Sequence, residues 1–294
     1  MKKKFLILGL LLAMTLACAT AQPPAPATSA PSVETLVAGT IQAMTAAAPQ
    51  VTAAPTATSA PTVNGTAVSF ENISFTLPTD AAFSALAGNV PAVMDEMSGS
   101  EIPQHVKFEL DGYALYDTFF DAQILVYPAP AYAAMNDAAA QSVAALQAIV
   151  NGTTAANKDN LPRIVTFNAG QLFAAQIQVV RFANGAGVRS LVEYGQYYAT
   201  VNNRDLFYQF QGLTSDGKYF ILAILPISHP LLAINEKPET VPPTGGLPFP
   251  GYDDPDAIAA YYNDATSLLN SAAPNSFQPA LTSLDRLTES LNIQ

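Results

Sequence analysis

The chain is poor in cysteine, histidine and basic residues. Its 294 residues include one cysteine, Cys18, and two histidines, His105 and His229. A single cysteine cannot form a disulfide within the chain, so the stability of the fold must come from an apolar core. Half of the residues are hydrophobic and only 12% are charged, which is enough apolar material for such a core.

The scarcity of basic residues limits the classes of partner that the protein can bind. There are 12 Lys and Arg against 23 Asp and Glu, which gives a formal net charge of -11. Loss of an N-terminal signal that contains three of the lysines would make the mature chain more negative still. Such a field repels phosphate groups, and no basic cluster opposes it, so the sequence predicts no nucleic-acid partner.

Motifs of enzymatic chemistry are also missing. The chain has no G-x-S-x-G elbow, P-loop or G-x-G-x-x-G pattern, and its glycine-rich segment 184–187 lies between two expected strands, which indicates a turn. The spacing of His105 and His229 does not suggest a metal site, and both are expected at the surface or as caps. The sequence therefore predicts that the protein is not an enzyme. No catalytic residue and no cofactor are expected.

The N-terminus has the pattern of a targeting signal. Lys2, Lys3 and Lys4 precede a short apolar run, and the cysteine follows directly after Ala17. A basic segment, an apolar segment and a small residue at the cleavage point are typical of a secretory signal. A cysteine at this place is where bacterial lipoproteins are cut and acylated. We therefore predict a signal peptide over residues 1–17 and a lipid on Cys18 that anchors the chain to the outside of the membrane, in the cell envelope.

Two alternatives to this anchor remain open. Thr15 and Leu16 depart from the usual order of a large and then a small residue, and Ala19-Thr20-Ala21 would allow cleavage before Gln22 and release of a secreted, soluble protein. An uncut membrane anchor is the other alternative, but about 13 apolar residues are short against the ~20 that span a bilayer. No other apolar run in the sequence approaches that length.

Residues 18–66 consist almost entirely of Ala, Pro, Thr and Ser. Such a segment buries too little apolar surface to offset the entropy of ordering it, and its prolines favour an extended spacer, so we expect a disordered stalk. One segment within it, residues 32–48, has apolar residues at helical spacing after Ser32 and predicts a short helix.

Residues 67–294 predict a single globular domain of the α+β class. Asn-Gly, Asn-Asn and Asp-Gly pairs at 184–185, 202–203 and 216–217 predict tight turns of an antiparallel meander. Several strands are apolar on both faces, so we expect a largely antiparallel sheet of about six to eight strands covered by helices on both faces. The expected strands are a hairpin over 68–77 and segments 105–113, 120–128, 176–182, 187–201, 204–213 and 217–227.

Three helices are expected to cover this sheet. The first runs from about residue 131 to 150 on one apolar stripe. The second begins after Asp254-Pro255, where an N-cap is followed by proline at the first helical position. The last begins near Pro279 and carries leucines at three- and four-residue steps.

Two segments carry a resemblance to known proteins. The stretch LFYQFQGLTSDGKYFILAILPISHPLL and the closing FQPALTSLDRLTESLNI, together with the stalk, are similar to an uncharacterised group of bacterial lipoproteins from filamentous Chloroflexota. This resemblance implies a lipoprotein but brings no catalytic or binding residues. In element order the chain also resembles the PsbP/Mog1-like α/β/α sandwich, which implies a non-enzymatic binding or assembly protein.

Two sets of residues are candidate sites. Tyrosines pair a flat apolar ring with a polar tip, so Tyr194, Tyr198, Tyr208 and Tyr252 are candidates for a ligand groove near the Pro/Gly-rich loop 235–255, although packing in the core would use the same residues. Asp253, Asp254 and Asp256 are a weak candidate for calcium, and helix capping is the simpler reading.

The sequence thus predicts a non-catalytic lipoprotein of the cell envelope. It would present an acidic domain for binding or assembly with an envelope protein, a peptide or a glycan. The alternatives are a small-ligand-binding lipoprotein that serves a transporter and, third, a secreted hydrolase.

Overall fold

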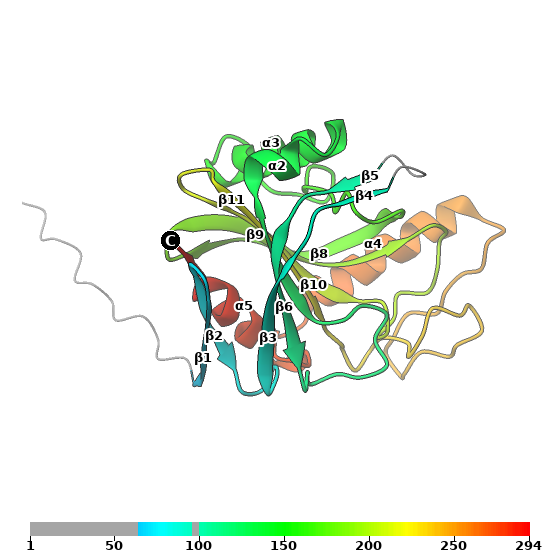
Figure 1. Cartoon of the computed structure of the whole chain (residues 1–294). Coiled ribbons are helices and arrows are strands. Elements are labelled where there is room, and N and C mark those ends of the chain that lie inside the picture. Colours follow the sequence, from blue (N-terminus) through cyan, green and yellow to red (C-terminus); the bar gives the residue numbers. More distant parts are fainter. Residues whose placement is uncertain (1–63, 96–99) are drawn as a thin grey trace, which may run out of the picture. The chain divides into compact units, whose positions relative to one another are not determined.

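The computed structural model describes residues 64–95 and 100–294 (Figure 1). The predicted signal peptide, Cys18 and most of the predicted stalk, with its segment 32–48, lie outside these residues. The described fold is α+β, as the sequence predicts. Its strands are β1 (Gly65–Phe70), β2 (Ile73–Pro78), β3 (Ser84–Val90), β4 (Val93–Asp95), β5 (Ser100–Ile102), β6 (His105–Asp111), β7 (Gln123–Pro128), β8 (Gly170–Phe182), β9 (Gly185–Gly195), β10 (Phe207–Thr214), β11 (Tyr219–Pro226) and β12 (Asn292–Ile293). Its α-helices are α2 (Ala129–Ala133), α3 (Asp137–Val150), α4 (Pro255–Ser271) and α5 (Leu281–Glu289).

A seven-stranded antiparallel sheet forms the centre of the fold, with the strand order β3-β6-β7-β11-β10-β9-β8. The last four strands in this order form the predicted meander. A smaller sheet, β1-β2-β12, joins the predicted N-terminal hairpin to the C-terminus of the chain, and β4 and β5 form a separate hairpin. The sequence did not predict β3, β4, β5 or β12.

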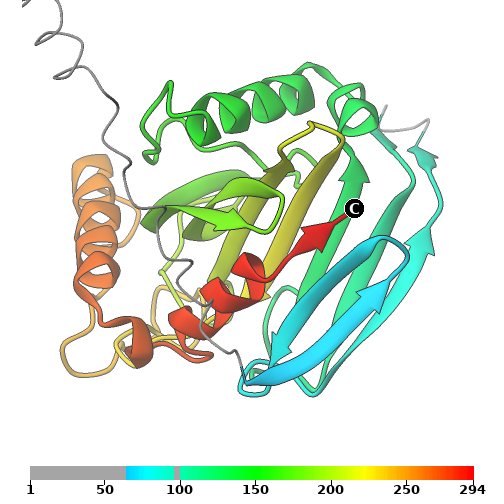
Figure 2. The ribbon, with the colours of Figure 1, turned by 90° about the vertical axis from the view of Figure 1, so that its left-hand side faces the viewer.

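Helices cover both faces of the large sheet (Figure 2). Because successive side chains of a strand point to opposite faces, β11 contributes to two cores. Phe220, Leu222 and Ile224 pack under α2 and α3, whereas Ile221 and Leu225 pack under α4 and α5. This is why the sequence of β11 has no polar side, as the sequence analysis inferred.

The first covering helix differs from the prediction. Instead of one helix from about residue 131 to 150, the chain forms α2 and α3 with a break between them. Asn136 lies in this break with an extended backbone, and its Oδ1 accepts a hydrogen bond from the N–H of Ala139 at 2.9 Å. An asparagine that caps a new helix ends the preceding one, because its own backbone leaves the helical region.

The predicted tight turn at residues 202–203 is wrong. β9 ends at Gly195 and β10 begins at Phe207, so a longer connection, residues 196–206, replaces both the turn and the end of the strand that was expected to reach residue 201. Asn202 is fully buried in this connection and forms side-chain hydrogen bonds that a hairpin asparagine in solvent would lack. This loop builds much of the site described below.

The predicted turns at 184–185 and 216–217 and the starts of the last two predicted helices are confirmed. Gly217 has a φ of +70° in the turn between β10 and β11, where glycine is favoured, and Asp216 Oδ1 accepts from the N–H of Lys218 at 3.1 Å. The C-terminal helix α5 begins at Leu281, close to the predicted start. None of the helices in the described residues is long and apolar enough to cross a membrane.

Candidate functional site

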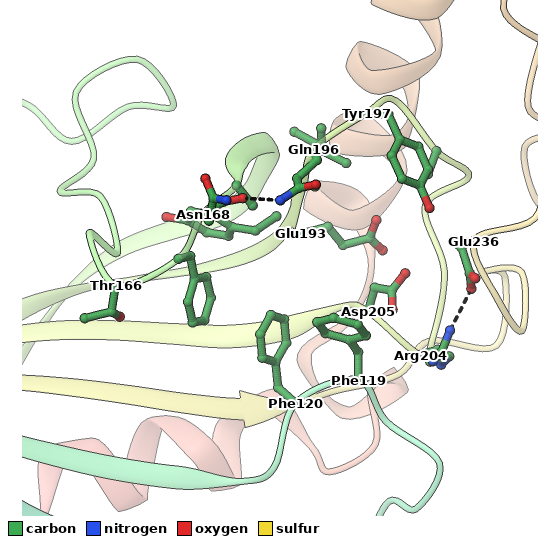
Figure 3. Close-up of a pocket in the computed structure, with 16 residues that line it drawn as sticks. Phe119, Phe120, Thr166, Asn168, Glu193, Gln196, Tyr197, Arg204, Asp205 and Glu236 are labelled. Carbon is green, nitrogen blue, oxygen red and sulfur yellow. Dashed lines mark hydrogen bonds and ion pairs between the residues drawn. The ribbon is translucent and has the colours of Figure 1, made fainter. Parts of the chain in front are cut away.

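A cavity of about 530 Å³ lies at the end of the large sheet where β9 ends and β8 begins (Figure 3). Its walls come from the segment before β7, the segment before β8, the end of β9 and the connection 196–206. Because these parts are far apart in the sequence, no single motif could reveal the cavity. Its volume lies within the range of about 300 to 1,000 Å³ that is usual for small-molecule sites.

One wall of the cavity is aromatic. The rings of Phe120 and Phe167 stack in parallel planes with their centroids 4.8 Å apart. Phe119 packs edge-on against Phe120 at 4.8 Å, and Tyr194 packs edge-on against Phe167 at 5.3 Å. Phe119 is 60% exposed, so this cluster reaches from the core to the surface and offers ring faces and edges to a ligand.

The cavity is also lined by two carboxylates that turn toward one another in Figure 3, Glu193 and Asp205. Asn202 binds both of them. Its backbone N–H donates to Glu193 Oε1 at 2.7 Å and its Nδ2 donates to Asp205 Oδ2 at 3.0 Å. Asn202 Oδ1 in turn accepts from the N–H groups of Arg204 and Asp205, at 2.9 and 3.1 Å, so the position of Asn202 is fixed on every side.

Burial disfavours the ionised form of both carboxyl groups. Burial raises the pKa of Glu193 well above its ordinary value, the hydrogen bond from Asn202 partly offsets this effect, and the nearby charge of Asp205 adds to it. Burial also raises the pKa of Asp205, and the negative charge of Glu236 adds to this rise. The hydrogen bond from Asn202 and the positive charge of Arg204 lower the pKa and partly offset the rise. Asp205 Oδ1 is buried and has no hydrogen-bond partner in the described chain.

An ion pair closes the rim of the cavity. Arg204 Nη1 lies 3.1 Å from Glu236 Oε2, and the guanidinium stands 5.7 Å from the centroid of the Phe119 ring. The backbone N–H of Phe119 also donates to the carbonyl oxygen of Arg204 at 2.8 Å. These contacts tie the segment before β7 to the connection 196–206.

Helix α4 holds this connection from the other side. The Tyr261 hydroxyl accepts a hydrogen bond from the N–H of Val201 at 2.8 Å. The Tyr262 hydroxyl contacts both backbone groups of Ala199. Because the connection has no strand partner here, the two phenols supply the hydrogen bonds that its buried backbone needs.

Of the four tyrosines predicted to line a groove, only Tyr194 lines this cavity. Tyr208 points from β10 to the opposite face of the sheet, where it is buried in the other core. Tyr198 and Tyr252 are 55% and 53% exposed and lie outside the lining. The structure therefore does not bring the four predicted residues together in one site.

The aspartates of the calcium candidate serve the start of α4. Asp254 Oδ1 accepts from the N–H groups of Asp256 and Ala257, at 2.9 and 3.2 Å, which is the N-cap that its position before Pro255 predicts. Within residues 64–95 and 100–294, no three His, Cys, Asp or Glu side chains are placed to hold a metal ion. The set Asp253, Asp254 and Asp256 is thus not gathered for that purpose.

The two histidines lie near opposite ends of β11 and outside the cavity. Both are buried, so neither is a surface residue, but His229 has the capping role that was the other expectation, because its Nδ1 accepts from the N–H of Leu231 at 3.4 Å. His105 Nδ1 contacts the carbonyl oxygen of Pro103 at 2.9 Å, and His229 Nε2 contacts Ser276 Oγ at 3.1 Å. Burial lowers the pKa of each histidine, which favours the neutral ring.

Glu193 and Asp205 are the site residues that sequence reasoning missed. One signal for Glu193 was present, because a carboxylate in the apolar strand sequence GVRSLVEYG must be buried on one face or the other. Phe119 and Phe120 gave no signal of this kind. Comparisons with protein-family models, with curated proteins and with solved structures find no match to this chain.

Proposed function

We propose that the chain is an extracytoplasmic lipoprotein, anchored through a lipid on Cys18, whose folded region binds a small molecule without converting it. The N-terminal basic and apolar segments before Cys18 support the anchor. The cavity beside Glu193 supports the binding of a small molecule.

The observation that carries this proposal is the composition of the cavity. It combines an aromatic wall with a few fixed polar groups, and this combination is typical of small-molecule sites. The sequence alone favours an envelope protein, a peptide or a glycan as the partner. The concave shape and the size of the cavity favour a small molecule over such a larger partner.

Phe119 and Tyr116 provide a matched test. Phe119 lines the cavity and is 60% exposed, while Tyr116 lies outside the lining, on the same segment, and is 92% exposed. Replacement of either exposed ring by alanine costs little stability.

Full-length protein in non-ionic detergent is screened for a rise in Tm with cationic, neutral and anionic metabolites. We expect at least one class to raise the Tm of the wild type and of Tyr116→Ala, but not that of Phe119→Ala. If no metabolite raises the Tm, or if Phe119→Ala responds like the wild type, the proposal is wrong.

A second candidate function, hydrolysis, is favoured by Glu193 alone. A buried carboxyl group with a raised pKa next to a second carboxylate can act as a proton donor, as in glycoside hydrolysis. Release of nitrophenolate from 4-nitrophenyl glycosides by the wild type, lost about a hundredfold in Glu193→Gln, would support this candidate. Absence of turnover in the wild type would leave the binding proposal in place.

A further inference from the structure

The cavity has an unbalanced charge. Among the described residues that line it, Arg204 is the one cationic side chain, and its guanidinium is paired with Glu236 at the rim. Glu193 and Asp205 lie deeper and have no cationic partner in the described chain. The charge of Arg204 reaches Asp205 only from beyond ion-pair distance, so in the described chain two neighbouring carboxyl groups share no directly paired cation and are costly to ionise together.

The two carboxyl groups also have unused acceptor capacity. Within residues 64–95 and 100–294, Asp205 Oδ1 is buried without a hydrogen-bond partner, and Glu193, which is 1% exposed, accepts one hydrogen bond, at Oε1. An ionised carboxylate can accept about four hydrogen bonds. A ligand group that carries several N–H donors and a positive charge would meet both needs at once.

The aromatic wall suits the same kind of ligand. Phe120 and Phe167 line the same cavity as the carboxylates and offer it a flat apolar surface, which Tyr194 extends. Aromatic faces attract cations as well as apolar groups. The net charge of -11 of the chain adds a field that concentrates cations around it.

We propose that this cavity binds an organic cation, with an ammonium group between Glu193 and Asp205 and a flat apolar body against Phe120 and Phe167. This inference rests on the proposed function and names its ligand class. A sugar would stack on the same rings but would bring no charge to the two carboxylates. A bare metal ion would leave the aromatic wall unused and would need a third protein ligand that the described residues do not place there.

Proton release is a second consequence of this geometry. Burial and the neighbouring Asp205 raise the pKa of Glu193, and a bound ammonium group would lower that pKa again, so binding of the amine is linked to the release of protons. The other titratable groups that face Glu193 are the phenols of Tyr261 and Tyr262 from α4. Burial raises the pKa of Tyr261 to about 12 and that of Tyr262 further, so both phenols stay protonated near neutral pH and do not contribute to the release.

Three probes of matched shape test the ligand class. Phenethylamine is cationic, 2-phenylethanol is neutral and phenylacetate is anionic. Each has a phenyl ring with a two-carbon substituent, and in phenylacetate the second carbon is the carboxylate. Binding to the full-length protein in non-ionic detergent is measured by calorimetry in two buffers of different ionisation enthalpy. We expect phenethylamine to bind at least about tenfold more tightly than 2-phenylethanol, phenylacetate not to bind, and the amine to release a proton.

Conservative variants locate the binding. Glu193→Gln and Asp205→Asn keep the shape of the cavity but remove its charge, and each should weaken phenethylamine at least about tenfold while leaving 2-phenylethanol unchanged. Glu239→Gln is the matched control, because Glu239 is exposed on the same loop as Glu236 and does not line the cavity. Binding of the amine that is no tighter than that of the alcohol, or that is equal in Glu193→Gln, overturns the inference.

The outcomes separate this inference from the proposed function. If a neutral or anionic metabolite binds in a way that depends on Phe119 while phenethylamine does not, the ligand class is wrong and the binding function stands. If no metabolite and none of the three probes shows binding that depends on Phe119, the proposed function and this inference both fail.

Discussion

Tyr262 and Ala199 exchange two hydrogen bonds: the phenol donates to the carbonyl oxygen of Ala199 at 2.8 Å and accepts from its N–H at 2.9 Å. A single hydroxyl of α4 thus replaces the strand partner that the connection after β9 lacks. Ala199 lines the cavity, so this pair fixes one part of the wall to the helix.

Tyr262→Phe should therefore destabilise the protein and loosen the cavity wall. The variant leaves a buried N–H and a buried C=O unpaired, which costs about 1 to 3 kcal/mol of unfolding free energy. Urea denaturation measures this loss, and hydrogen exchange at the amide of Ala199 should become faster. The control is Tyr252→Phe, because Tyr252 is 53% exposed and should show neither effect. Unchanged exchange at Ala199 would mean that the phenol does not hold the wall.

A buried ion pair fastens α5 to the sheet. Arg189 of β9 is 5% exposed in its side chain, and its Nε lies 3.1 Å from Asp285 Oδ1. Arg189 also donates from Nη1 to the carbonyl oxygen of Gln176 and from Nη2 to Gln178 Oε1. Tyr208 donates to Asp285 at 3.0 Å, so the carboxylate has two partners from the sheet.

Arg189→Met should cost about 3 kcal/mol of unfolding free energy, because it leaves the charge of Asp285 without its partner. Burial already raises the pKa of Asp285 and Arg189 opposes this, so without the arginine Asp285 should take up a proton more readily. The loss measured by urea denaturation should therefore be smaller at pH 5 than at pH 7. Addition of Asp285→Asn to Arg189→Met should restore part of the stability at pH 7. A double variant that is less stable than Arg189→Met at pH 7 would contradict this account.

The sequence predicts the fold better than it predicts the cavity, for a physical reason. Alternation, turn residues and helix caps are local, so β10, β11 and the start of α4 at Asp254 could be assigned from neighbouring residues. The exceptions are segments where tertiary hydrogen bonds override the local pattern. Asn202 and the residue that follows it have the composition of a hairpin turn, but the bonds of Asn202 to Glu193 and Asp205 make it the centre of a longer buried loop.

The cavity depends on contacts that the sequence pattern does not contain. Phe120 and Phe167 are far apart in the chain and stack only because the segments before β7 and before β8 meet at the same edge of the fold. Tyrosines of the strands were the more obvious candidates, yet their alternation sends Tyr194 to the cavity and Tyr208 to the opposite face. Strand parity was readable in the sequence, but it does not locate the cavity, because Glu193 and Tyr194 are consecutive in β9 and both line it.

The predicted anchor can be tested by one substitution. Cys18→Ser removes the only thiol that can carry the lipid, so the protein should move from the membrane fraction to the soluble fraction. Fractionation and intact-mass spectrometry of the purified protein measure this change. Thr20→Ser is the control, because it leaves the cysteine and should stay in the membrane fraction. A wild-type N-terminus at Gln22, without added lipid mass, would show that ordinary signal cleavage is used instead.

Glu193 predicts how stability depends on pH. Its pKa is raised by burial in the folded chain, so the folded protein holds a proton that the unfolded chain releases above about pH 4.3, the usual pKa of a glutamate. The unfolding free energy contributed by this group is therefore greatest at low pH and declines as the pH rises through the folded-state pKa. Glu193→Gln carries no titratable group, so it should match the wild type near pH 4 and become more stable than the wild type as the pH rises. Urea denaturation of both proteins from pH 4 to pH 8 measures the difference, and a difference that stays constant over this range would show that Glu193 ionises as freely in the folded chain as in the unfolded one.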